Sequence, residues 1–214
     1  MHHDTESSNT ISWKDKLSIS NEHRMRKLIM WNVITLDGYF EGRENWDLGF
    51  HELVWGEELE DFSKDQLKSA DMLIFGAVTY KGMADYWTKA EGDKLEGEVA
   101  RYMNALPKIV CSRHLKTAAW SNTTLVRDAE KEIPELKRKG NGNMFVFGSG
   151  KLSESLMNAG LFDEYRLCIA PGFLGNGRLL FNQGIPHTKL RLLQALPLAT
   201  GGTILRYAPD GNTI

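Results

Sequence analysis

Short apolar runs alternate with amphipathic segments along most of the chain. Apolar runs of strand length, bounded by glycine, proline or polar turn residues, predict strands. Apolar side chains that recur every three or four residues predict helices. The predicted strands cover residues 26–35, 72–76, 108–112 and 123–126, and the predicted helices cover residues 53–70, 79–87, 94–105 and 130–139. The pattern over residues 144–170 is typical of a strand, a glycine turn, a short helix and a second strand.

Strands that alternate with helices predict an α/β fold, in which a mostly parallel twisted sheet carries helices on both faces. Residues 190–200 and 203–207 are expected to form a C-terminal antiparallel hairpin across Gly201-Gly202. No low-complexity linker interrupts residues 25–210, so we expect one domain there. Residues 1–24 are polar and charged, and we expect a flexible N-terminal extension.

Composition and charge exclude several classes of function for this protein. The net charge is −2, and no stripe of Lys and Arg interleaves with aromatic residues, so no nucleic-acid partner is expected. The longest apolar run is roughly seven residues, well below the ~20 of a spanning helix, so no membrane partner is expected. Cys111 and Cys168 lie in separate apolar runs, which supports neither a disulfide framework nor a cysteine metal site. These observations favour a cytoplasmic location.

Glycine, hydroxyl and charged residues stand where four of the predicted strands end. They are Asp37, Gly76, Thr79, Ser112, Arg113, Gly148, Ser149, Gly150 and Lys151. In an open α/β sheet, ligands bind outside the carboxyl ends of the strands, and the N–H groups at a helix start suit a phosphate. Together these strand ends favour a long, doubly phosphorylated ligand such as a dinucleotide. Each also has an ordinary structural explanation, for example Thr79 as a helix N-cap.

Four sequence motifs stand out along the chain: TLDGY at 35–39, GxxTY at 76–80, CSR at 111–113, and a longer block at 147–177 that contains FGSGKL, GLFDEYRL and PxxLGxG. Together they resemble the RibD C-terminal domain family of the dihydrofolate reductase-like superfamily. The resemblance covers about residues 26 to 208 and implies a dihydrofolate reductase-like fold. It also implies an NADPH-dependent reductase of a small pyrimidine- or pterin-like substrate. The expected reaction is the reduction of 5-amino-6-(5-phosphoribosylamino)uracil in riboflavin biosynthesis.

The resemblance also implies where the cofactor binds. The pyrophosphate would meet residues 148–151 and the helix that begins at 76–79, and the adenosine 2′-phosphate would meet Ser112 and Arg113. The nicotinamide would lie near Val33 and the turn at Asp37. Family members usually carry an arginine directly after the first glycine of the GxxT motif, where this chain has Ala77. NADH therefore remains an alternative to NADPH. Arg113 is the candidate for the positive charge that Ala77 does not supply.

Hydride transfer leaves an atom that needs a proton, and two carboxylates are candidates for this acid. Glu60 has about the spacing from Gly76 at which dihydrofolate reductases carry a carboxylate, although it flanks the apolar face of its helix. Asp47 lies beside Trp46, which either stacks on a planar ligand or packs in the protein. Two histidines, His51 and His114, are weaker candidates for proton transfer. Trp31 and Trp55 have the same two interpretations as Trp46, and packing in the core is favoured for both.

Two alternative functions stay open. A carboxylate facing the floor of the pocket would indicate dihydrofolate reduction, and loss of the acid would leave a nucleotide-binding protein without catalysis. The H-x-E and P-C-x-x-C motifs of the fused zinc deaminase domain do not occur, so the resemblance implies a stand-alone reductase domain. Family relatives are often dimers, and we expect a homodimer.

Overall fold

A computed structural model describes residues 25–90, 92 and 97–211 of this chain. The predicted extension over residues 1–24 and the first three residues of the predicted helix at 94–105 lie outside the described residues. Within the described ranges, no helix has the length and apolar character needed to cross a membrane.

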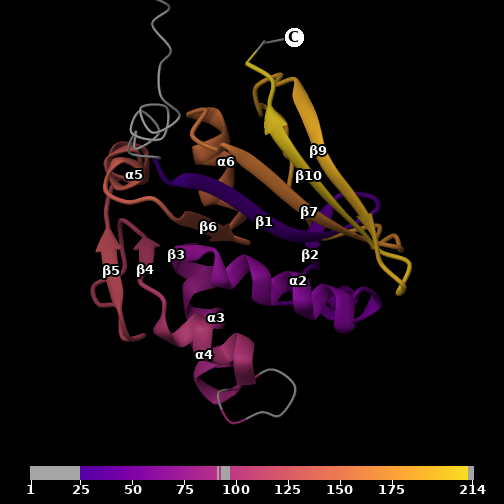
Figure 1. Ribbon diagram of the computed structural model, residues 1–214, viewed down its shortest axis with the longest axis horizontal. Coiled ribbons are helices and arrows are strands. Elements are labelled where there is room, and N and C mark those ends of the chain that lie inside the picture. Colours follow the sequence, from indigo (N-terminus) through magenta and orange to yellow (C-terminus); the bar gives the residue numbers. More distant parts are fainter. Residues whose placement is uncertain (1–24, 91, 93–96, 212–214) are drawn as a thin grey trace, which may run out of the picture.

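An eight-stranded sheet in the order β5-β4-β3-β6-β1-β7-β10-β9 forms the centre of the molecule (Figure 1). Six of its strands are mutually parallel, and β10 runs antiparallel to both of its neighbours. The parallel strands are β1 (Lys27–Thr35), β3 (Ala70–Gly76), β4 (Lys108–Cys111), β5 (Thr123–Val126), β6 (Asn143–Phe147) and β7 (Glu164–Ala170), and the hairpin consists of β9 (Leu190–Pro197) and β10 (Thr203–Pro209). The predicted mostly parallel sheet with a C-terminal antiparallel hairpin is therefore confirmed.

Helices cover both faces of the sheet, as predicted. One face carries α2 (Glu57–Lys68), α3 (Ala77–Ala90) and α4 (Gly97–Ala105), and the other carries α5 (Ala129–Arg138) and α6 (Gly150–Asn158) (Figure 1). Because side chains alternate along a strand, β1 contributes to two apolar cores. Ile29, Trp31 and Val33 pack on the side of α2–α4, whereas Met30 and Ile34 pack on the side of α5 and α6.

Several element boundaries differ from the prediction. The predicted helix over residues 53–70 is shorter in the structure, where α2 covers Glu57–Lys68 with Gly56 as its N-cap, and a separate 3-10 helix, η1 (Gly49–Leu53), precedes it. The predicted helix over residues 79–87 begins earlier, at Ala77, so Thr79 is a buried residue of the first turn of α3 and not its N-cap. The two-stranded sheet of β2 (Tyr39–Glu41) and β8 (Arg178–Leu179) was missed. Strands of two or three residues are too short to show an alternating pattern.

Candidate active site

A cleft of about 1660 Å³ follows the carboxyl edge of the sheet and continues between the sheet and helices α2–α4. Pockets for a single drug-sized ligand are roughly 300–1000 Å³, so this cleft has room for a cofactor and a substrate together. Most of the predicted site residues line it. They are Val33, Gly76, Thr79, Ser112, Arg113, Gly148, Ser149, Gly150 and Lys151.

The ends of β3 and β6 form one corner of the cleft. These strands are parallel neighbours, so α3 and α6 both begin at the same edge. The Ser149 hydroxyl accepts a hydrogen bond from the Gly76 backbone N–H at 2.8 Å and donates one to the Phe147 carbonyl at 3.2 Å. The turn places Gly148 at a φ of +56° and Ser149 at a φ of 63°, a left-handed conformation that glycine adopts without strain. The corner is thus fixed by a hydrogen bond between two strand ends.

Glycines at this corner allow close packing. A Cβ atom at Gly150 would lie 2.7 Å from the Phe40 ring, so Phe40 occupies the space of a side chain there. A Cβ atom at Gly148 would lie 3.4 Å from the Thr79 methyl group. Lys151 follows directly and is exposed to the cleft, where its charge adds to the positive ends of two helices.

The turn after β4 forms a second corner. The Ser112 hydroxyl accepts hydrogen bonds from the backbone N–H groups of His114 and Leu115, at 3.2 and 3.0 Å. Arg127 donates to the carbonyls of Ser112 and Leu115, at 2.8 and 2.7 Å. Ser112 therefore fixes the turn, and the Arg113 side chain is the exposed charge that this turn presents to the cleft. Sequence reasoning missed Arg127, although it follows a strand end as Arg113 does.

Asp37 does not line the cleft. Its carboxylate accepts hydrogen bonds from the Thr35 hydroxyl at 2.5 Å and from the backbone N–H groups of Leu174 and Gly175, at 3.1 and 2.8 Å. Burial acts to raise the pKa of Asp37, but these hydrogen bonds hold it below its usual value. Asp37 therefore ties the turn after β1 to the loop after β7.

Neither candidate acid lines the cleft. Glu60 forms an ion pair with Lys64 at 2.7 Å, and the exposed Asp47 side chain packs against Gly42. The residues of α2 that do line the cleft are Leu59, Ser63, Gln66 and Leu67. The number of residues between Glu60 and Gly76 does not determine which face of α2 carries Glu60. Because the helix has 3.6 residues per turn, Glu60 points away from the face that carries Leu59 and Ser63.

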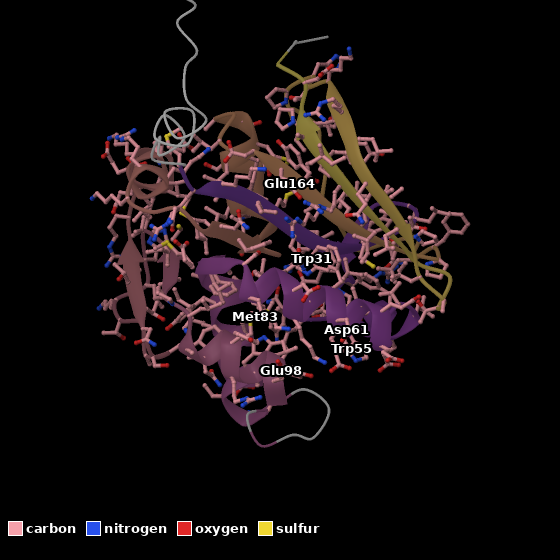
Figure 2. All side chains as sticks on the ribbon, viewed as in Figure 1. Trp31, Trp55, Asp61, Met83, Glu98 and Glu164 are labelled. Atoms are coloured by element: carbon pink, nitrogen blue, oxygen red, sulfur yellow. The ribbon has the colours of Figure 1, made fainter. Side chains whose placement is uncertain are left out.

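Aromatic side chains form the walls of the cleft on the side of α2–α4. Trp31 is 8% exposed and packs on the Phe62 ring with centroids 5.4 Å apart; Figure 2 shows it between β1 and α2. Trp55 is 41% exposed, so its prediction as a core residue is wrong. Trp46 packs against Gly82 of α3, where a Cβ atom would lie 2.1 Å from its indole ring. These indoles provide flat apolar surface for a planar ligand.

Buried polar groups also reach this cleft. Burial lowers the pKa of His51 to about 4, so the imidazole is neutral at pH 7. His51 Nε2, Asn32 Nδ2 and Gln66 Nε2 are buried, and none of them has a hydrogen-bond partner within the described part of the chain. Sequence reasoning missed Asn32 and Gln66, because burial without a partner is visible only in three dimensions.

This sheet order, with helices on both faces and a cleft along the carboxyl edge, defines the dihydrofolate reductase-like class of folds. The structure is similar to a putative riboflavin biosynthesis protein from Shewanella sp. PV-4, with a TM-score of 0.69 and 19% identity over 86% of this chain and 99% of that chain. It is also similar to dihydrofolate reductase from Enterococcus faecalis, solved with NADP(H), with a TM-score of 0.58 and 13% identity over 88% of this chain and 99% of that chain.

The family model of the RibD C-terminal domain matches residues 26–204, so the chain belongs to this family, as its motifs predicted. The uncharacterized protein YyaP of Bacillus subtilis (strain 168) is 25% identical over 194 residues, which cover 90% of this chain and 100% of that protein. RibD of Acinetobacter baumannii is 15% identical with a TM-score of 0.60, and the match covers 87% of this chain and 58% of RibD.

Proposed function

We propose that this protein is an NAD(P)H-dependent reductase that transfers a hydride to a small pyrimidine- or pterin-like heterocycle. One observation carries the proposal. The two helix starts at Ala77 and Gly150 open onto the same cleft as an aromatic recess beside α2. An elongated anionic cofactor and a planar substrate would then share one continuous site. Membership of the RibD C-terminal domain family supports this assignment.

The residues at the corners fit a reduced nicotinamide dinucleotide, which supplies the hydride when bound. The first N–H groups of α3 and α6 and the charge of Lys151 would bind the pyrophosphate. Arg113 would bind the adenosine 2′-phosphate, and the absence of an arginine at Ala77 leaves NADH as an alternative cofactor. Val33 would support the nicotinamide, and Asp37 would act by holding the loop at Leu174.

Solvent is the proposed source of the proton. All of α2 lies within the described residues, and none of its carboxylates lines the cleft. Asp47, which precedes η1, does not line the cleft either, so neither Asp47 nor Glu60 is in position to act as the acid. Two polar residues of the cleft, Ser63 and the neutral His51, would order the water that protonates the reduced substrate. The lack of an inward carboxylate on α2, where dihydrofolate reductases carry one, does not favour dihydrofolate as the substrate.

Binding of NADPH is expected to raise the melting temperature, because a ligand that binds only the folded state stabilises it. At a concentration one hundred times the Kd, the gain is about 2.7 kcal/mol. Lys151→Glu is expected to reduce the shift, since it replaces a cation of the cleft by an anion. Thermal shift measurements with millimolar NADPH and NADH test this.

Lys116→Glu is the matched control, because Lys116 is exposed and does not line the cleft. Binding without NADPH oxidation in the presence of candidate pyrimidines and pterins would favour a non-catalytic nucleotide-binding protein. Absence of any shift with both dinucleotides would refute the proposed function.

We also propose a homodimer through the free edge of the sheet. β9 is the last strand of the sheet and pairs with β10 alone among the described strands. It exposes Leu190, Leu192 and Leu193, and an open apolar edge favours pairing with another chain. Light scattering after size exclusion is expected to give twice the 24.2 kDa of one chain, and Leu192→Glu is expected to give the mass of one chain. A single-chain mass for the wild type would contradict this.

A cytoplasmic location also stays a prediction.

A further inference from the structure

The side-chain amide of Gln66 is satisfied at one end only. Gln66 is 3% exposed and lines the cleft. Its Oε1 atom accepts a hydrogen bond from Arg166 Nη1 at 3.2 Å. Its Nε2 atom is buried and has no partner within the described ranges. Because a guanidinium can only donate, the oxygen must face Arg166, and the NH2 group is the end left for the cleft.

A chain of buried side chains fixes this orientation. Arg166 Nε donates to Glu164 Oε1 at 2.6 Å, and Arg206 Nε donates to the same oxygen at 2.7 Å. The Arg166 guanidinium also lies over the Phe145 ring, 5.2 Å from its centroid. With Arg166 held on several sides, a flip of the Gln66 amide would bring its NH2 group against a cation. The amide therefore has one favourable orientation.

The surroundings of Gln66 indicate which kind of acceptor would bind its NH2 group. Buried donors almost always have an acceptor, and a buried NH2 group without one destabilises the folded protein. The lining of the cleft on this side of the sheet is mostly apolar and partly aromatic, with Trp31, Leu59, Leu67 and Met103 contributing beside the polar Asn32 and Ser63. An acceptor atom that enters this recess must therefore be carried by a flat, largely apolar body. A carbonyl group on an aromatic or conjugated ring has these properties.

We propose that Gln66 Nε2 recognises a ring carbonyl of the substrate and sets specificity for oxo-substituted heterocycles. The inference rests on the proposed function, because it assigns the substrate to the aromatic end of the same cleft. Gln66 is the residue that touches the substrate. Arg166, Glu164 and Arg206 are positioning residues that keep the donor turned toward it.

The test compares two probes in the full-length protein. One is 1,3-dimethyllumazine, a pteridine whose two carbonyl groups accept hydrogen bonds and whose ring nitrogens carry no hydrogen. The other is pteridine, the same bicycle without carbonyl groups. Dissociation constants are measured by quenching of tryptophan fluorescence, since Trp31, Trp55 and Trp87 line the cleft. Gln66→Met has a similar length and no donor, and it is expected to weaken dimethyllumazine binding about tenfold or more while pteridine binding changes less than about twofold.

Gln66→Glu is the second variant, because it keeps an acceptor for Arg166 and replaces the NH2 donor by a carboxylate oxygen that can only accept. It is expected to lose dimethyllumazine binding to at least the same extent. Equal losses for both probes in both variants would mean that Gln66 acts through packing, and unchanged binding would mean that water satisfies the amide. Either result, or a wild type that binds neither probe, overturns the inference. The NADPH-induced shift in melting temperature, measured on the same variants, tests the proposed function separately.

Discussion

Replacement of Glu164 by alanine is expected to lower the free energy of unfolding by about 3–5 kcal/mol, which is the usual cost of removing one partner of a buried ion pair. Glu164 is 1% exposed and accepts hydrogen bonds from two arginines through one oxygen; Figure 2 labels it in the sheet. The alanine variant would leave Arg166, itself 8% exposed, as a buried cation without its counterion. Urea unfolding followed by circular dichroism measures the loss.

Two further variants separate charge from shape at this position. Glu164→Gln keeps the size and one acceptor oxygen but removes the negative charge, so we expect a loss smaller than that of the alanine variant. Glu135→Ala breaks an exposed ion pair with Arg138, and exposed pairs contribute about 0–1 kcal/mol. A loss at Glu164 no larger than the loss at Glu135 would show that the buried network does not stabilise the fold.

The end of the cleft that carries the glycine turns and the exposed cations could be predicted from the sequence because of topology. Parallel strands all end at one edge of a sheet, so recognising strands that alternate with helices already brings their carboxyl ends together. Gly76, Arg113 and Lys151 belong to different strand ends and nevertheless line one cleft. Predicting that these residues share one edge of the sheet requires only the order of strands and helices, and no knowledge of side-chain contacts.

The end of the cleft beside α2 could not be predicted in this way, because its lining depends on contacts between distant residues and on the rotation of the helix. Asp37 follows a strand end like the others, yet its carboxylate is bonded to the backbone of Leu174 and Gly175 on another loop. Gln66 is one of many polar residues on an amphipathic helix until Arg166 fixes one end of its amide. Glu60 was placed by its distance along the chain, but the rotation of α2 decides which side chains face the cleft.

The stability of the protein is expected to fall by about 3 kcal/mol between pH 6.5 and pH 4 because of His51 alone. Burial lowers the pKa of His51 from 6.5 to about 4 in the folded state, whereas an unfolded chain keeps the ordinary value. Between these two values the unfolded state binds a proton that the folded state does not, so the free energy of unfolding decreases as the pH falls. Each unit of pKa difference corresponds to about 1.4 kcal/mol.

The difference between wild type and His51→Leu isolates this contribution from the carboxylates that titrate in the same range. We expect the stability of the wild type relative to this variant to decrease by about 3 kcal/mol from pH 7.5 to pH 4 and to change little below pH 4. Urea unfolding at several pH values measures both proteins. His114→Leu, at an exposed position, shows the effect of losing a histidine that is not buried. A pH-independent difference for His51→Leu would mean that water or a rearrangement of η1 solvates the imidazolium, and His51 would then not stay neutral in the cleft below pH 6.5.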